Sequence, residues 1–211
     1  MTIQSIIDAA RQYTQITGSS WFTAIDEMRS VNRAYRDIYE KILDSNDEFF
    51  IKETTVLLSA MTLVRDHTYE YDLPVDWHRL RKIVAVLPDG ERQLERLDPM
   101  EIQRYEGYRF FGNKLRITFQ SAYDTFRIEY YPTPQEYLTT VETIVYPPQL
   151  EPLIIAYQMA MDITKAQKGD PTPWAEEYLR LWQRFEHATM RRDNFRYPRV
   201  ANVYRSTYPG W

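Results

Sequence analysis

Two carboxylates, Asp72 and Asp76, flank Pro74, and their spacing is the nearest thing in the chain to a catalytic pattern. A pair of facing carboxylates can act as general acid and base. In a turn, however, such side chains more often accept hydrogen bonds from backbone N–H groups. Because no nucleophile, metal ligand or oxyanion donor can be assembled beside them, we favour the turn role and expect no catalytic residue.

The residues that usually hold metals and phosphates give no pattern either. His67, His78 and His187 lack the His-x-x-His and His-Glu-x-x-His spacings of metal sites. The chain contains no cysteine, which excludes disulfides, thiolate zinc sites and cysteine nucleophiles and fits a reducing cytoplasm. With six glycines and no Gly-x-Gly-x-x-Gly or P-loop, a phosphate cradle is not expected. We therefore expect no metal, no cofactor and no enzyme activity.

A segment rich in arginine and aromatic residues closes the printed sequence. From Arg180 onward seven Arg and two acidic residues give a charge of +5. The whole chain has a net charge of −4, so residues 1–179 carry −9 (−4 − 5 = −9). Such a segment can bind nucleic acid by phosphate pairing and stacking, or dock on protein. The acidic remainder favours docking, with nucleic-acid binding as the alternative. The candidate contact residues are Arg191, Arg192, Phe195, Arg196, Tyr197, Arg199, Tyr204, Arg205, Tyr208 and Trp211.

The stretch from Tyr69 to Ile83 is predicted to be a strand, a corner and a second strand. Aromatic and acidic residues alternate over 69–72, the period of a half-buried strand. Pro74 ends the pairing because it has no N–H and holds Leu73 extended. We expect Trp77, with Leu80, to pin the β-rich region onto the helices. The corner also supplies candidate subunit contacts, which are Asp76, Trp77, His78 and Arg79.

Amphipathic helices are predicted on both sides of this region. Apolar residues recur at helical spacing over 3–16 and 24–43, and Thr23 with an acid three residues later is a capping signature. After Pro147-Pro148, similar stripes run over 150–168 and 173–192. The two ends of the chain are therefore expected to form a helical bundle.

Between the helices the chain is rich in β-branched and aromatic residues. Clean alternation over 114–119 and 126–131 favours antiparallel pairing, and 98–105 is predicted to hold a short helix. The fold class is α+β, with a helical bundle, a central antiparallel β-rich insertion and an extended C-terminal tail. The expected regions are 1–47, 48–146, 147–193 and 194–211. Further strands are predicted at 49–51, 54–58, 69–71, 83–87, 92–97 and 108–111.

Composition and hydropathy indicate a protein that works outside membranes. No apolar run approaches the roughly 20 residues that span a bilayer, and the first residues lack the basic and apolar parts of a signal peptide. Aromatic residues make up 15% of the chain, and 17 of them are Tyr. Tyr is favoured in strands and at protein interfaces, so this content fits either use.

The order of the motifs resembles a known family. Amphipathic helices, with a Trp before the second, precede Tyr-Asp-Leu-Pro-x-Asp-Trp-x-Arg-Leu at 71–80 and Gly-Asn-x-Leu-x-Ile at 112–117. Ile-Glu-Tyr-Tyr-Pro at 128–132 and two helices follow. This order resembles the head-to-tail adaptor (connector) proteins of tailed bacteriophages. The resemblance covers about residues 1–190 and leaves out the segment after Asn194.

The resemblance implies a structural protein in the neck of the virion, assembled in the host cytoplasm. Its copies, commonly twelve, would form a ring under the portal protein, extend the DNA channel and offer a platform to a tail or nozzle protein. Double-stranded DNA would pass without sequence-specific binding, and an acidic body would let it slide. Such a ring needs two different faces on each subunit.

Overall fold

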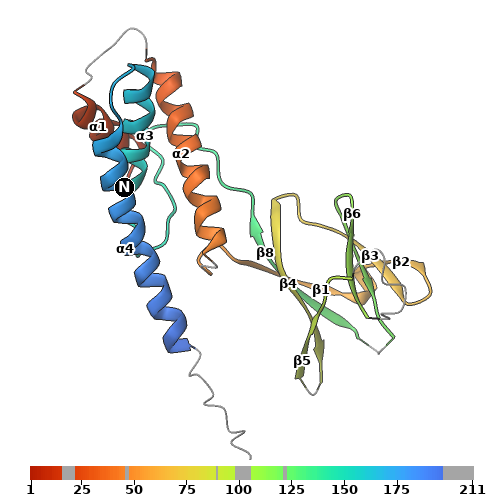
Figure 1. Cartoon of the computed structure of the whole chain (residues 1–211). Coiled ribbons are helices and arrows are strands. Elements are labelled where there is room, and N and C mark those ends of the chain that lie inside the picture. Colours follow the sequence, from red (N-terminus) through yellow and green to blue (C-terminus); the bar gives the residue numbers. More distant parts are fainter. Residues whose placement is uncertain (16–21, 46–47, 89, 98–105, 121–122, 197–211) are drawn as a thin grey trace, which may run out of the picture. The chain divides into compact units, whose positions relative to one another are not determined.

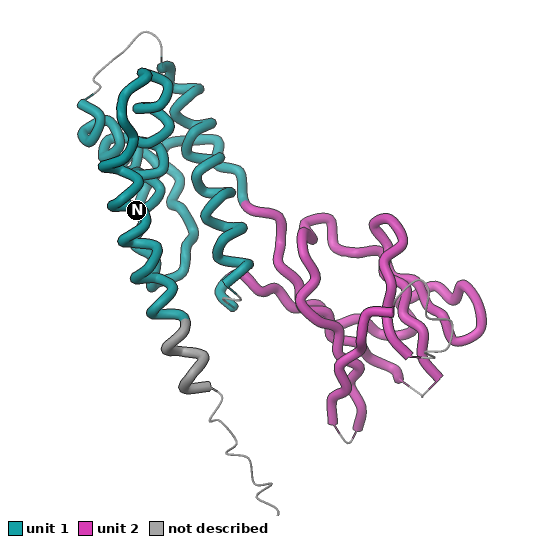
Figure 2. Tube along the Cα trace, in the orientation of Figure 1, with its two compact units in different colours: residues 1–49, 135–211 teal, residues 50–134 magenta. Residues whose placement is uncertain are grey.

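A computed structural model describes residues 1–15, 22–45, 48–88, 90–97, 106–120 and 123–196, without the side chains of 190–196. The chain divides into two compact units, one of residues 1–49 and 135–211 and one of residues 50–134 (Figure 2). The first contains the described helices of more than one turn, and the second contains two antiparallel sheets. The predicted α+β class is confirmed.

Four α-helices make up most of the described part of the helical unit (Figure 1). Helix α3 packs against the other three, because buried aliphatic residues lie on most of its sides. Local chemistry sets the helix starts: the Thr23 side chain accepts from the backbone N–H of Asp26, and the Asp26 carboxylate accepts from that of Thr23. The bounds are α1 (Ile3–Thr14), α2 (Ala24–Asp44), α3 (Leu153–Ala166) and α4 (Thr172–Arg196).

The residues of the β unit that the structure describes form two four-stranded sheets with the orders β1-β8-β4-β5 and β2-β3-β7-β6. Every strand pair is antiparallel. The short turn η1 (Leu58–Ala60) follows β1. The strands are β1 (Lys52–Leu57), β2 (Thr62–Arg65), β3 (Thr68–Asp72), β4 (Trp77–Leu87), β5 (Gly90–Leu94), β6 (Gly107–Phe111), β7 (Lys114–Thr118) and β8 (Thr125–Pro132).

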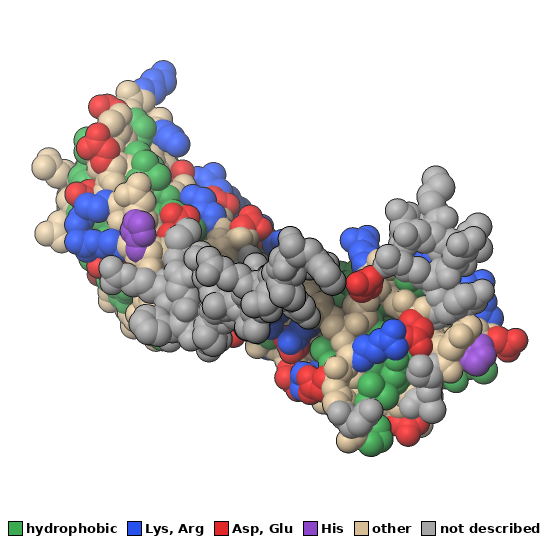
Figure 3. Space-filling view, turned by 60° about the horizontal axis from the view of Figure 1, so that its bottom comes forward, with side chains coloured by type: hydrophobic (Ala, Val, Ile, Leu, Met, Phe, Trp, Pro, Cys, Tyr) green, Lys and Arg blue, Asp and Glu red, His purple; other side chains and the backbone are tan. Residues whose placement is uncertain are grey.

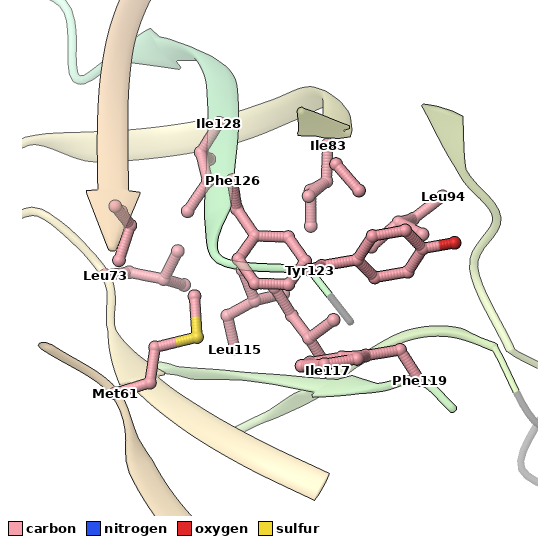
Figure 4. Packing of buried hydrophobic residues seen from close by; sticks show 12 residues of the cluster. Met61, Leu73, Ile83, Leu94, Leu115, Ile117, Phe119, Tyr123, Phe126 and Ile128 are labelled. Carbon is pink, nitrogen blue, oxygen red and sulfur yellow. The ribbon is translucent and has the colours of Figure 1, made fainter. Parts of the chain in front are cut away.

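One hydrophobic core lies between these two sheets. Leu115 and Ile117 of β7 point toward Ile83 of β4 and Phe126 of β8, and all four side chains are buried (Figure 4). The alternation along β7 explains this, since Arg116 between the two apolar residues turns to the outer face. The core therefore follows from the period of two in the sequence.

The two sheets are also joined through their backbones. Residues 95–97 continue from β5 and pair with β6, where the N–H of Leu97 donates to the carbonyl of Tyr108 at 2.9 Å. The neighbouring Gly107 has φ +154°, and a Cβ there would lie 2.6 Å from the carbonyl oxygen of Glu95. Glycine is therefore required at the point where the two backbones approach.

Three strand predictions differ from the structure. No strand forms at 49–51, where residues 48–50 make a bend and a turn before β1 begins at Lys52. β4 begins at Trp77 instead of residue 83, because register shifts at Trp77/Arg79 and Leu80/Lys82 interrupt the alternation that marks a strand. β2 was not predicted: it has four residues, all of them exposed, and so shows no pattern. The short helix expected at 98–105 lies outside the described residues.

Residues 135–146, assigned by sequence to the β-rich region, lie in the helical unit. Their backbone pairs with the start of the chain: the N–H of Ile3 donates to the carbonyl of Glu142 at 3.0 Å, and the N–H of Ile144 donates to that of Met1 at 3.3 Å. β-Branched residues are common in this segment, which is why it reads as strand-like.

Candidate protein-interaction site

The corner after β3 is organised by Asp76. Its carboxylate accepts from Lys52 Nζ at 2.6 Å and from the hydroxyl of Tyr130 at 3.1 Å. Its backbone carbonyl accepts from the N–H of Thr133 at 2.6 Å. The hydrogen bond from Lys52 lowers the pKa of Asp76, against an opposing effect of burial, and the Tyr130 hydroxyl adds to the lowering. Asp76 thus joins the corner to β1 and β8. The donors to its carboxylate are the side chains of Lys52 and Tyr130, whereas the sequence led us to expect backbone N–H groups of the turn.

The second carboxylate of the expected pair, Asp72, has a different partner. Its side chain is 77% exposed and lies 3.7 Å from Lys114 Nζ. Lys114 also donates to Glu70 at 2.7 Å, so Asp72 belongs to the charges on the outer face of β3 and β7. Asp76 therefore pairs with Lys52, and Asp72 lies near Lys114, so the two aspartates have different cationic partners.

Trp77 makes its contacts inside the β unit. Its ring stacks on Phe110 at 5.2 Å between centroids, and Leu80 packs with it against the β core. These contacts place Trp77 and Leu80 on the β core, and their expected contact with the helices stays a prediction. His78 and Arg79 lie exposed on β4, and their role as subunit contacts stays a prediction.

Two apolar side chains are exposed at the end of the second sheet. Val75 is fully exposed, and Phe111, at the turn between β6 and β7, is 64% exposed with the Arg116 guanidinium 4.0 Å from its ring centre. The N–H of Leu73 donates to the carbonyl of Asn113, which places the corner beside this turn. Phe111 was not predicted as a contact residue, although an aromatic side chain just before a Gly-Asn turn was a usable signal.

The outer face of the first sheet carries an ion-pair cluster around Glu129. Its carboxylate accepts from Arg81 at 2.5 Å and from Lys82 at 2.9 Å. The register shift between Leu80 and Lys82 lets two consecutive residues reach one partner. Burial tends to raise the pKa of Glu129, but the hydrogen bonds from Lys82 and Arg81 outweigh it and lower the pKa.

Similar pairing is widespread on the β unit. Arg116 donates to Glu70 at 2.8 Å, and Arg127 donates to Glu91 at 2.7 and 2.5 Å. In the view of Figure 3, cationic and acidic side chains are interspersed on the described surface of both units. Most cations of the β unit named here are thus already neutralised by a neighbouring carboxylate.

The C-terminal candidates are only partly described. Arg191, Arg192, Phe195 and Arg196 lie in α4, which continues to Arg196 and so beyond the predicted start of the tail at residue 194. Their side chains are outside the described part of the structure. The other six candidates, Tyr197, Arg199, Tyr204, Arg205, Tyr208 and Trp211, lie outside the described residues altogether, so the tail's contacts stay a prediction.

Within the ranges that the structure describes, no group of three or more His, Asp or Glu side chains is placed to hold a metal ion. No helix in those ranges is both long enough and apolar enough to span a membrane.

The described part of the chain thus combines a helical unit with a β unit whose sheets carry ion pairs, and exposed apolar side chains lie at the corner and turn of the second sheet. The sequence matches the SU10 adaptor protein family over residues 1–203, and the chain belongs to that family. A search of curated proteins found no match. The chain is thus a structural adaptor protein of phage and a virion component that associates with other head and tail proteins, and the resemblance found in the sequence is confirmed at this level.

Proposed function

We propose that the chain is a head-to-tail adaptor that forms a ring under the portal protein in the neck of the virion. The ring, commonly of twelve copies, extends the DNA channel and offers the attachment surface for a tail or nozzle protein. The observation that carries this proposal is the match to a phage adaptor family over residues 1–203. Assembly would take place in the host cytoplasm, from which the ring joins the portal.

The charge distribution supports passage of DNA without binding. Residues 1–179 carry a formal charge of −9 (−4 − 5). Within the β unit, Glu70 pairs with two cations and Glu129 with three. A lysine or arginine that already has a carboxylate partner is less available to hold a phosphate. DNA would therefore slide past these faces.

The segment after Phe195 is proposed to reach a neighbouring subunit or the portal. It combines Arg with Tyr and Trp, the residue types that most often anchor protein interfaces. A free segment of this composition would leave much apolar surface in water, which favours docking over solvation.

Mixing the protein with the portal protein of the same phage tests the proposal. We expect rings on the portal by negative-stain imaging, with a mass that gives the copy number. A protein truncated after Phe195 is expected to keep its helical and β circular dichroism while losing the complex. Absence of any complex with the full chain contradicts the adaptor proposal, and an unchanged complex after truncation contradicts the role of the segment.

DNA-binding measurements on the full chain test the alternative that the basic segment binds nucleic acid. Its charge of +5 from Arg180 onward (7 − 2) favours this alternative. It requires salt-dependent binding to double-stranded DNA that falls when Arg191, Arg192 and Arg196 are changed to Ala. Lack of binding at low salt removes the alternative and leaves the adaptor proposal in place.

A further inference from the structure

An irregular segment of the helical unit, residues 135–146, is held in one shape by hydrogen bonds. The side chain of Asn32 donates to the carbonyl of Tyr137 and accepts from its N–H, both at 2.8 Å. The Tyr137 ring is buried, and its hydroxyl accepts from the N–H of Val145 at 2.9 Å. Irregular segments that are ordered in this way commonly carry function.

Glu142 closes a turn within this segment. Its carboxylate accepts from the backbone N–H groups of Leu138 and Thr139 at 3.0 and 2.7 Å, and from the Thr139 hydroxyl at 2.9 Å. These bonds, led by the one from the Thr139 backbone, lower the pKa of Glu142. The carboxylate is charged at neutral pH, so the turn is firmly closed there.

The closed turn points aliphatic side chains into water. Leu138 and Val141 are each 79% exposed. Glu136 beside them is exposed too, and no hydrogen bond or ion pair joins it to another described residue. A turn that is fixed by this many bonds and still leaves two aliphatic side chains uncovered indicates a contact with another protein. The partner must offer an apolar spot beside a cation.

Helix α2, orange in Figure 1, offers such a surface on its outward side. Ile25 is 64% exposed, and the exposed residues Arg29, Arg33 and Arg36 follow at spacings of three or four, which places them on one side of the helix. Arg33 pairs with Asp162, and Arg29 lies 4.0 Å from Asp26. Arg36 has no hydrogen bond or ion pair to another described residue. The α2 face, defined as these four residues, is apolar at one end and basic along the rest.

The other exposed aliphatic residue on a described helix is less suitable. Leu179 of α4 is 54% exposed, but its neighbours include Glu176, and the adjacent Arg180 already pairs with Glu177 at 2.5 Å. An acidic turn would meet a carboxylate there. Charge complementarity therefore favours the α2 face over the surface around Leu179.

We propose that the turn 136–142 of one copy packs on the α2 face of the next copy. Leu138 and Val141 cover Ile25, and Glu136 pairs with Arg36. This proposal rests on the proposed function, for which it supplies the contact between ring subunits. Because two different surfaces meet, each copy keeps one of each for its neighbours, which is the condition for growing a ring.

Cross-linking between single-cysteine variants tests the contact, since the chain has no cysteine of its own. Leu138→Cys protein is mixed with Ile25→Cys protein and treated with a short bis-maleimide, both free and in the complex with the portal. Leu179→Cys, also exposed in the helical unit, replaces Ile25→Cys in the control mixture. We expect the Leu138–Ile25 product to exceed the control product severalfold by intact mass.

The cross-linking results test the contact and the proposed adaptor role independently of each other. Equal yields with Ile25→Cys and Leu179→Cys inside a portal complex overturn the contact and leave the adaptor role standing. A specific product in the free protein without any portal complex supports the contact and contradicts the adaptor role. Absence of both the product and the complex overturns both.

A charge exchange tests the polar half of the contact. Glu136→Arg and Arg36→Glu are each expected to lower the specific cross-link yield roughly fivefold, because like charges then face each other. With both changes in one chain, every interface again pairs opposite charges, and the yield should return. A double variant that stays as weak as the single variants overturns the assignment of this pair.

Discussion

At the scale of single residues, Asp76 shows how a polar turn residue can hold a domain together. One carboxylate and one carbonyl connect β1, the start of β4, β8 and the segment that leaves the β unit. An aspartate beside a proline predicts bonds to backbone N–H groups of a turn, whereas the Asp76 carboxylate binds two side chains. The partners Lys52 and Tyr130 lie 24 and 54 positions away, so no local pattern reveals them.

Replacing Asp76 with Asn should lower the free energy of unfolding at neutral pH by about 1 kcal/mol, because Lys52 loses its ion pair. The folded protein holds the pKa of Asp76 below its ordinary value. The stabilisation is therefore complete above the pKa that Asp76 has in the unfolded chain, about 4. It is lost as the pH falls through the lower pKa that Asp76 has in the folded protein. Urea denaturation from neutral to acidic pH should show the two proteins converging in acid.

Asp72→Asn is the matched control for this prediction. Asp72 is more exposed than Asp76, and its cation lies farther away, at 3.7 Å. Its replacement should change stability little at any pH. A gap between wild type and Asp76→Asn that is the same at every pH would show that the carboxylate's charge is not the source of the stabilisation.

At the scale of elements, Gly107 sits where two backbones pass close to each other. Gly107→Ala should destabilise the β unit, because a Cβ meets the Glu95 carbonyl at 2.6 Å and φ is +154°. Gly90→Ala is a matched control, with φ +153° and nothing within 4 Å of the added Cβ. We expect Gly107→Ala to cost about 2 kcal/mol more than Gly90→Ala in chemical denaturation. Equal losses would assign the effect to backbone conformation alone.

Elements fixed by local chemistry could be predicted closely. Helix α2 was expected at 24–43 and runs from Ala24 to Asp44, because its capping box and its apolar stripe are both local. Strand β7 was expected at 114–119 and spans Lys114–Thr118. The first half of β4 was missed because register shifts are set by the neighbouring strand, which sequence alone does not identify.

At the scale of the whole molecule, the order of motifs led to the family, whereas the surfaces did not follow from sequence. Leu138, Val141 and Phe111 look like core residues on paper, since exposure depends on which long-range contacts form. Trp77 packs on Phe110 within the β unit, a partner that lies 33 positions away and that no local pattern identifies. Single apolar residues in irregular segments carry no period from which burial can be inferred.

The β unit should fold as an isolated fragment of residues 50–134. It has its own core, and Lys52 pairs with Tyr130, so the two ends of the fragment are neighbours. We expect a β-type circular dichroism spectrum and a cooperative urea transition. Phe126→Ala in the same fragment, which removes a fully buried ring, should lower the midpoint strongly or unfold it. A fragment without a cooperative transition would show that the β unit depends on the rest of the chain.

The route of the chain into and out of the β unit has a mechanical consequence. β1 and β8 are antiparallel neighbours, and the chain enters and leaves at the same end of this pair. Tension between residues 50 and 134 would therefore open the hydrogen bonds between them one by one, as in a zipper, instead of shearing them together. The first rung joins Lys52 to Tyr130, and Asp76 binds both side chains there. A pull along the chain is thus first resisted at this rung, where a single carboxylate holds both strands.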